Sequence, residues 1–177
     1  MLVGTAFPGN GAAVSASPAQ LRAVLGHFPS GVTIVTAVHD GVPVGFTCQA
    51  FNSLSLDPPM VSFAVSRASK TRPRILATGR FCVNVLAADQ QFLCRRFAAP
   101  SPDRFHGVGW RYSPAGSPVL DGVVAWVDCT VAAEYPAGDH TIVLGNVTDL
   151  DCARECEPLV FLRGLLMPGA PLPLSRA

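Results

Sequence analysis

Charged residues are scarce in this chain of 177 residues, because Asp, Glu, Lys and Arg together make up only 14% of it. A typical soluble domain has about 25%. Since 49% of the residues are hydrophobic, we infer that another subunit covers part of the surface, and we expect a homodimer. The formal net charge of +1 offers no basic stripe of the kind that nucleic-acid binding requires, so nucleic acid is not an expected partner.

Long hydrophobic runs are also missing. No uninterrupted apolar run reaches the ~18 residues that a membrane-spanning helix needs. The N-terminus has neither the basic start nor the hydrophobic block of a signal peptide. We therefore expect a soluble, cytoplasmic protein without a membrane partner. The length fits one domain, whose core needs neither disulfides nor metal.

Metal-site and disulfide patterns are absent from the cysteines as well. Three residues separate Cys152 from Cys156, but no second ligand pair accompanies them, so we expect no metal. Reduced and mostly buried thiols account best for the six cysteines, which are Cys48, Cys82, Cys94, Cys129, Cys152 and Cys156. The chain also has very little lysine, since Lys70 is the only one.

Signatures of self-contained catalysis are lacking too. No Ser/His/Asp or Cys/His set has the local context for hydrolysis or acyl transfer. There is no Walker loop and no Gly-x-Gly-x-x-Gly fingerprint. Any redox or transfer chemistry would therefore come from a bound cofactor.

The hydrophobic pattern predicts a mainly β protein with an antiparallel barrel and short capping helices. Residues 1–16 read as a flexible arm, 17–166 as the folded domain and 167–177 as a Pro-rich tail. Expected strands cover 32–38, 42–44, 60–66, 80–86, 123–135, 140–149 and 158–166, and a long loop covers 98–121. Asp40-Gly41 is the expected turn between the first two strands. A Ser17-Pro18 start with Gln20 predicts the first helix, Thr71 is expected to cap the second, and Asp89 is expected to cap a third that ends near Phe97.

The stretch Gly45–Pro59 alternates in polarity. If it is extended, one face carries Thr47, Gln49, Phe51, Ser53 and Ser55, and the other carries Phe46, Cys48, Ala50, Leu54 and Leu56. The small polar side chains would form a platform on which a flat ligand could lie. The same alternation is equally typical of a solvated sheet face, so the pattern alone leaves both interpretations open.

Two further places could contact a ligand. Ser69, Lys70 and Thr71 stand at an expected helix start, where backbone N–H groups, hydroxyls and a cation favour a phosphate. The alternative is a solvated helix cap. His140 follows Gly138-Asp139 at a turn into a strand, where it could contact a cofactor or simply be exposed.

In their order along the chain, several segments resemble the flavin reductase-like family. They are Val32 to Thr36, Gly45-Phe46-Thr47, Ser53 to Pro59, Ser69-Lys70-Thr71, Arg80 to Leu86, Arg96-Phe97, Asp103-Arg104-Phe105, Gly138-Asp139-His140 and Pro158-Leu159-Val160. The resemblance spans Ser17 to Gly164 and points to the reductase component of a two-component flavin-dependent monooxygenase. It implies a split β-barrel homodimer that binds FMN or FAD, reduces it with NADH or NADPH and supplies a separate monooxygenase.

The resemblance also implies roles for individual residues. The isoalloxazine and ribityl chain would be lined by Thr47, Cys48, Gln49, Ala50, Ser53 and Ser55, and the phosphate would be held by Ser69, Lys70 and Thr71. Two residues would lie near the flavin, Phe81 and Asn84, and two near the phosphate or cofactor edge, Arg104 and Phe105. His140 would lie near the nicotinamide. Gln49 stands where similar proteins usually have Ser or Asn. Leu165 and Leu166 replace the aromatic expected after Arg163-Gly164.

Other functions remain to be distinguished from a reductase. One is a flavin-binding sensor or carrier without turnover, and another is a flavoenzyme that acts on a small substrate retained in the site. A third is a small β-barrel interaction module that binds no flavin. Catalytic NADH oxidation that depends on free flavin is the property that separates the reductase from all three.

Overall fold

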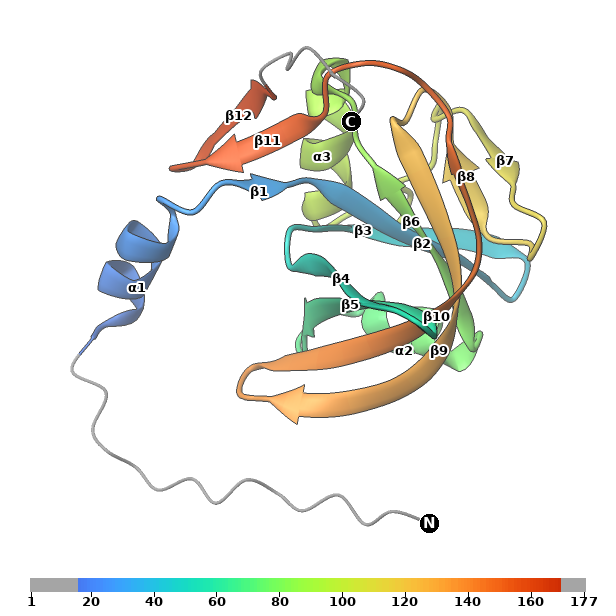
Figure 1. The fold of residues 1–177 in the computed structure, drawn as a ribbon, viewed down its shortest axis with the longest axis horizontal. Coiled ribbons are helices and arrows are strands. Elements are labelled where there is room, and N and C mark those ends of the chain that lie inside the picture. Colours follow the sequence, from blue (N-terminus) through green and yellow to red (C-terminus); the bar gives the residue numbers. More distant parts are fainter. Residues whose placement is uncertain (1–15, 170–177) are drawn as a thin grey trace.

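Antiparallel strands dominate the computed structural model, which describes residues 16–169 (Figure 1). The expected mainly β fold with a few short helices is confirmed. Residues 1–15 of the expected arm and residues 170–177 of the expected tail lie outside the described residues. No helix within residues 16–169 is long and apolar enough to cross a membrane.

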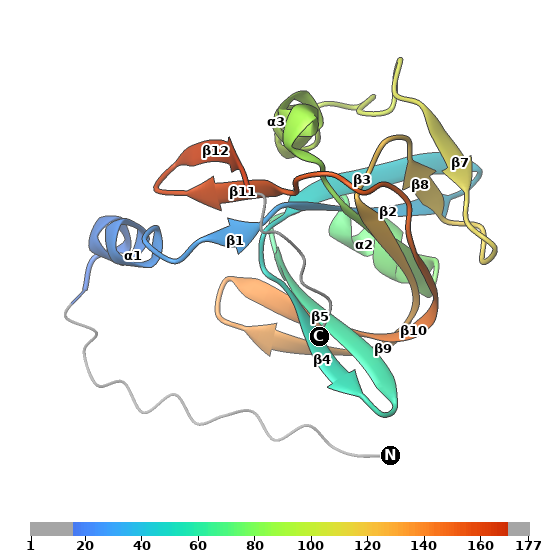
Figure 2. The same ribbon diagram turned by 45° about the horizontal axis from the view of Figure 1, so that its top comes forward.

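One seven-stranded sheet forms most of the fold, with the strand order β3-β2-β6-β9-β10-β5-β4 and antiparallel pairing throughout. Its strands curve around a common interior (Figures 1 and 2). They are β2 (Thr33–His39), β3 (Val42–Cys48), β4 (Phe51–Leu56), β5 (Pro59–Ser66), β6 (Arg80–Val85), β9 (Ala125–Ala137) and β10 (His140–Cys152). Asp40 and Gly41 have positive φ angles of 52° and 74°, so the expected Asp-Gly turn joins β2 to β3.

Smaller sheets complete the fold. The segment Pro158–Leu166 was expected to be a single strand, but it begins a hairpin of β11 (Leu159–Leu162) and β12 (Leu165–Pro168), so pairing continues past residue 166. Arg163 and Gly164 form its turn with φ angles of 51° and 82°. The short strand β1 (Ser30–Gly31) pairs with β11. Within the expected loop 98–121, β7 (Trp110–Tyr112) and β8 (Pro118–Leu120) pair as a second small hairpin.

Helix α1 (Pro18–Leu25) begins as its sequence predicts. The Ser17 side chain accepts a hydrogen bond from the Gln20 N–H at 3.2 Å, and the Gln20 side chain accepts one from the Ser17 N–H at 2.8 Å. The helix projects from the sheets and buries none of its side chains in the single chain (Figure 1). Its apolar residues are all exposed, namely Leu21, Val24 and Leu25, together with Phe28 just beyond the helix.

The starts of the other helices differ from expectation. Thr71 occupies the N-cap position of α2 (Arg72–Ala77) but makes no capping bond with its side chain. The Ser69 hydroxyl instead accepts a hydrogen bond from the Arg72 N–H at 3.3 Å.

Asp89 does not cap the third helix, because it lies within a 3-10 turn, η1 (Ala88–Gln90), that precedes α3 (Gln91–Ala98). Its carboxylate pairs with Arg154 at 2.9 Å, so it serves a tertiary contact in place of the cap.

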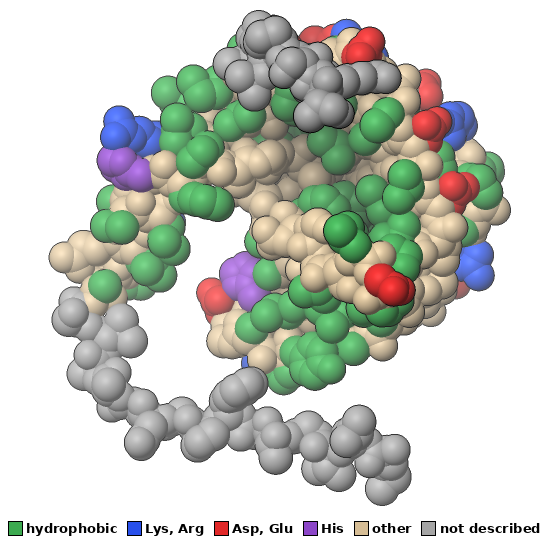
Figure 3. Space-filling view, in the orientation of Figure 1, with side chains coloured by type: hydrophobic (Ala, Val, Ile, Leu, Met, Phe, Trp, Pro, Cys, Tyr) green, Lys and Arg blue, Asp and Glu red, His purple; other side chains and the backbone are tan. Residues whose placement is uncertain are grey.

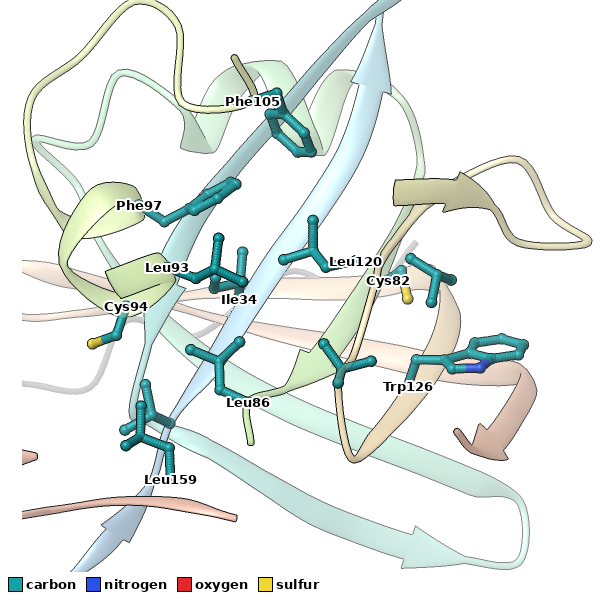
Figure 4. Packing of buried hydrophobic residues seen from close by; sticks show 13 residues of the cluster. Ile34, Cys82, Leu86, Leu93, Cys94, Phe97, Phe105, Leu120, Trp126 and Leu159 are labelled. Carbon is teal, nitrogen blue, oxygen red and sulfur yellow. The ribbon is translucent and has the colours of Figure 1, made fainter. Parts of the chain in front are cut away.

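Helix α3 packs directly on the sheet. Leu93 and Phe97 project from the helix towards Ile34 of β2, and all three side chains are buried in one hydrophobic cluster (Figure 4). A side chain at Gly45 would bring a Cβ atom to 3.0 Å from the Phe97 ring, so glycine allows β3 to approach the helix closely. A second cluster, centred on Phe63 and Phe81, fills the interior of the curved sheet.

The stretch Gly45–Pro59 is not one continuous strand. It breaks at Gln49 and Ala50, between β3 and β4, and a bulge lies between Ser53 and Ser55. The expected apolar face is therefore lost, because Leu54 and Leu56 are 49% and 89% exposed. β4 is an edge strand of the sheet, and most of its residues are exposed.

Candidate functional site

A cleft of about 720 Å³ opens where the end of β3 meets α3, the end of β5 and the β11–β12 hairpin. Its size is in the range typical of small-molecule sites. The lining residues are Phe46, Thr47, Cys48, Gln49, Ala50, Ala64, Val65, Ser66, Ser69, Cys94, Arg95, Ala98, His140, Phe161, Gly164, Leu165 and Leu166. A second, more polar hollow of about 470 Å³ lies at the β2–β3 turn and shares none of these residues.

The end of β3 is tied to α3 by a side-chain bond. The Thr47 hydroxyl donates a hydrogen bond to the Cys94 carbonyl at 2.7 Å. The thiol of the following residue, Cys48, contacts the Ala64 carbonyl at 3.6 Å. Burial raises the pKa of Cys48 to about 12. Burial also raises the pKa of Cys94. Both thiols therefore remain protonated at neutral pH and do not act as nucleophiles.

His140 stands at the first position of β10, opposite Ser66 of β5. Its Nδ1 lies 2.7 Å from a carboxylate oxygen of Asp139, and its side chain is 44% exposed. The hydrogen bond to His140 lowers the pKa of Asp139, with the charge of the imidazolium form as a further cause. The adjacent carboxylate thus orients the imidazole ring at the cleft wall.

Arg104 connects three walls of the cleft region. Its Nη1 donates to the Gly45 carbonyl of β3 and to the Thr71 hydroxyl, both at 2.8 Å. Its Nε and Nη2 donate to the Ala99 carbonyl at the end of α3, at 3.1 and 2.9 Å. Partial burial lowers the pKa of Arg104, but the guanidinium remains charged because its ordinary pKa is far above neutrality. Most of its N–H donors are thus used within the protein.

The β11–β12 hairpin forms the wall of the cleft next to α1. The Arg163 N–H donates to the Gly26 carbonyl at 2.9 Å, and the Arg163 Nη2 lies 2.9 Å from His27 Nδ1. Gly164, Leu165 and Leu166 follow directly and line the cleft. The position of this wall is therefore connected to α1, whose own apolar side is exposed.

The structure brings six of the expected site residues together in the lining of the cleft. They are Thr47, Cys48, Gln49, Ala50, Ser69 and His140. Lys70 is exposed next to Ser69, and Thr71 is held by Arg104. Ser53 and Ser55 lie on β4, outside the lining.

Three other expected residues belong to the core. Phe81 is fully buried and packs edge-on against Phe63, with ring centroids 5.1 Å apart. Asn84 is also fully buried, and its amide bonds to Ile34, Thr36, Pro118 and Leu120. Phe105 packs edge-on against Phe97. None of the three lines the cleft, and each supports strands or helices around it.

Several cleft residues carry no signal in the sequence. Cys94, Arg95 and Ala98 come from α3, and Phe161 comes from β11. No local pattern distinguishes them, because the helix and the hairpin reach the cleft only through tertiary packing. Leu165 and Leu166 had been singled out solely as a departure from the family pattern.

The lining is suited to a flat ring with an anionic tail. Small and apolar side chains form most of the walls, and the titratable or charged side chains are two thiols, His140 and Arg95. No cluster of three or more metal-ligating side chains occurs within residues 16–169. The cleft therefore provides surfaces for stacking and polar groups for orientation, and its two thiols are protonated at neutral pH.

Comparisons with known proteins agree with this geometry. The sequence profile of the flavin reductase like domain matches residues 25–169. The reductase subunit HsaB of a flavin-dependent monooxygenase from Rhodococcus jostii is 48% identical over 153 residues, which cover 86% of this chain and 78% of the relative.

Solved structures of related proteins are similar to this chain in fold and in sequence. Component B of nitrilotriacetate monooxygenase from Mycobacterium thermoresistibile matches with a TM-score of 0.84 and 46% identity over 89% of each chain. The NADH:FAD oxidoreductase SgcE6 of Streptomyces globisporus, in complex with NAD and FAD fragments, matches with a TM-score of 0.81 and 39% identity over 86% of this chain and 93% of that one.

Proposed function

The chain belongs to the flavin reductase-like family, and on that premise we propose that it transfers hydride from NADH or NADPH to FMN or FAD as the reductase component of a two-component monooxygenase. The observation that carries this proposal is the cleft at the end of β3, since it joins a stacking surface to polar and cationic groups. A flavin accepts hydride at its N5 atom directly from nicotinamide C4. The protein's task is then mainly to position two rings.

The walls of the cleft can perform this positioning. Phe46, Thr47, Cys48, Gln49 and Ala50 form one continuous edge, and the hydrogen bond from Thr47 to α3 fixes that edge relative to the helix. Along this edge the ring and ribityl chain of a flavin would find backbone groups and one amide side chain. Leu165 and Leu166 offer an apolar cover in place of an aromatic one.

Phosphate binding and nicotinamide binding are assigned to separate parts of the cleft. Ser69 lines the cleft and Lys70 follows it, so this loop supplies a hydroxyl and a cation for the flavin phosphate. His140 of β10 is paired with Ser66 of β5, and Asp139 orients its imidazole ring. This position suits a contact with the hydride donor. Direct hydride transfer requires no general base, so His140 serves binding and orientation.

A homodimer is part of the same proposal. The apolar side of α1, with Leu21, Val24, Leu25 and Phe28, is exposed in the single chain. Hydrophobic side chains are also visible along this helix in Figure 3. A second copy would bury this side, and because α1 contacts the hairpin through Arg163, the dimer would also support a wall of the cleft.

Steady-state oxidation of NADH and NADPH, each with added FMN or FAD, tests the proposed function. We expect the rate to rise with the concentration of at least one flavin and to saturate. The four combinations identify the preferred pair. A rate that is independent of added flavin would contradict the reductase assignment and favour a flavoenzyme that acts on a retained substrate.

A further inference from the structure

We propose that Arg95 binds the flavin phosphate from the side of the cleft opposite Ser69, so that the phosphate lies between the end of α3 and the loop after β5. This inference rests on the proposed flavin-binding function. The flavin phosphate would then be bound by residues of two cleft walls that are far apart in sequence. The chemical class of ligand is a phosphate monoester or diester on the ribityl chain.

The position of Arg95 follows from contacts on both sides of the cleft. Arg95 and Ser69 both line it, from α3 and from the loop between β5 and α2 respectively. The Arg104 guanidinium donates to the Ala99 carbonyl at the end of α3 and also to the Thr71 hydroxyl. Because one guanidinium spans both contacts, the last turn of α3 and residues 69–71 meet at the same end of the cleft.

Arg95 is also the only arginine or lysine that lines the cleft in the described part of the chain. Its side chain is exposed, and it lies on the last turn of α3. Five other arginines direct their guanidinium groups to protein partners, namely Arg72, Arg80, Arg104, Arg154 and Arg163. Within residues 16–169 Arg95 makes no such contact, so its donors are available to a ligand.

Arg95 suits the role of phosphate ligand better than Arg104 does. A guanidinium with free N–H groups can form two parallel hydrogen bonds to a phosphate, which are stronger than neutral ones. Arg104 has already committed most of its donors to Gly45, Thr71 and Ala99. It therefore holds the two walls in place, and Arg95 supplies the charge.

The helix end does not oppose an anion here. The carboxyl end of a helix carries partial negative charge, which by itself repels phosphate. Arg95 and Arg96 in the last turn offset that charge, and the Ala99 carbonyl is occupied by Arg104. The net local charge at this end of the cleft is therefore positive.

Equilibrium titration with FMN and with riboflavin tests the proposal, because riboflavin lacks the phosphate. We expect Arg95→Ala to weaken FMN binding about tenfold or more and to leave riboflavin binding within about twofold of the original protein. Arg95→Lys should lose less affinity for FMN, since it keeps the charge but not the paired donors. Arg96→Ala makes the same change in net charge on the same helix, outside the cleft lining, and should bind FMN normally.

Two results would overturn the proposal. Unchanged FMN binding by Arg95→Ala would remove Arg95 from the site, and equal losses for FMN and riboflavin would show an effect on the shape of the cleft. Failure of the unmodified protein to bind either flavin would instead contradict the proposed function itself. The titration thereby separates the two failures.

Discussion

Arg104 and Thr71 are joined by a hydrogen bond of 2.8 Å, and the same arginine nitrogen also bonds to Gly45 at 2.8 Å. The Thr71 hydroxyl, which makes no capping bond in α2, accepts this hydrogen bond from Arg104. It also links β3, the loop after β5 and the end of α3 at one point. The cleft between these elements therefore depends on a side chain that does not line it.

Arg104→Ala should lower both flavin affinity and the free energy of unfolding. We expect a loss of about 2 kcal/mol in stability, because several charge-assisted hydrogen bonds to backbone and hydroxyl oxygens disappear. Arg104→Lys should keep only part of this stability, since a compact ammonium group lacks the spaced, planar donors with which the guanidinium reaches Gly45, Thr71 and Ala99 together. Urea unfolding and flavin titration measure the two effects. A variant with normal stability but weak flavin binding would show that Arg104 contacts the ligand itself.

Lys70→Ala should weaken FMN binding, because a charge-assisted contact to phosphate contributes about 1.5–3 kcal/mol. This corresponds to a rise in Kd of about tenfold or more. Arg67→Ala removes the same charge from the same loop, two residues before Ser69, and is the matched control. If the two variants bound FMN equally well, Lys70 would have no place in the site.

His140→Ala should raise the KM for NADH severalfold and change kcat much less, because His140 is assigned to binding of the donor and not to proton transfer. His106 offers a control, since it is also a histidine near an aspartate, with its Nδ1 3.8 Å from Asp103, and it lies outside the cleft lining. His106→Ala should leave both constants unchanged. Identical kinetics for the His140 variant would exclude the proposed role.

Val24→Asp should convert the homodimer into monomers, because it places a charge in the apolar side of α1 that a second copy would bury. Ala23→Asp introduces the same charge one residue earlier, about 100° around the helix and outside the side formed by Leu21, Val24 and Leu25, and should preserve the dimer. Sedimentation or light scattering gives the oligomeric state of each. A monomeric original protein would contradict the proposed dimer.

The fold was predictable to the extent that local patterns determine it. The capping box at Ser17 and the turn at Asp40 and Gly41 depend on residues close together in sequence, and both form as expected. The cap at Asp89 was wrong because a distant partner, Arg154, competes for its carboxylate. The break and the bulge within Gly45–Pro59 could not be predicted, because alternation of polarity reveals neither.

The cleft was only partly predictable for the same reason. The edge from Thr47 to Ala50 and the positions of Ser69 and His140 followed from ordered motifs, and all of them line the cleft. Arg95 gave no signal, because a closing arginine on a helix has the same sequence context whether it faces a ligand or solvent. Phe81 and Asn84 lie in the core, where they support strands around the cleft.

Whether the protein turns over as a reductase is measured by the number of flavins reduced per chain under anaerobic conditions, with NADH and flavin both in large excess. The reductase account predicts that each chain reduces many equivalents of FMN or FAD, and that reduction continues until one substrate is exhausted. Reduction that stops at one equivalent per chain would contradict the account and identify a flavin-binding sensor or carrier.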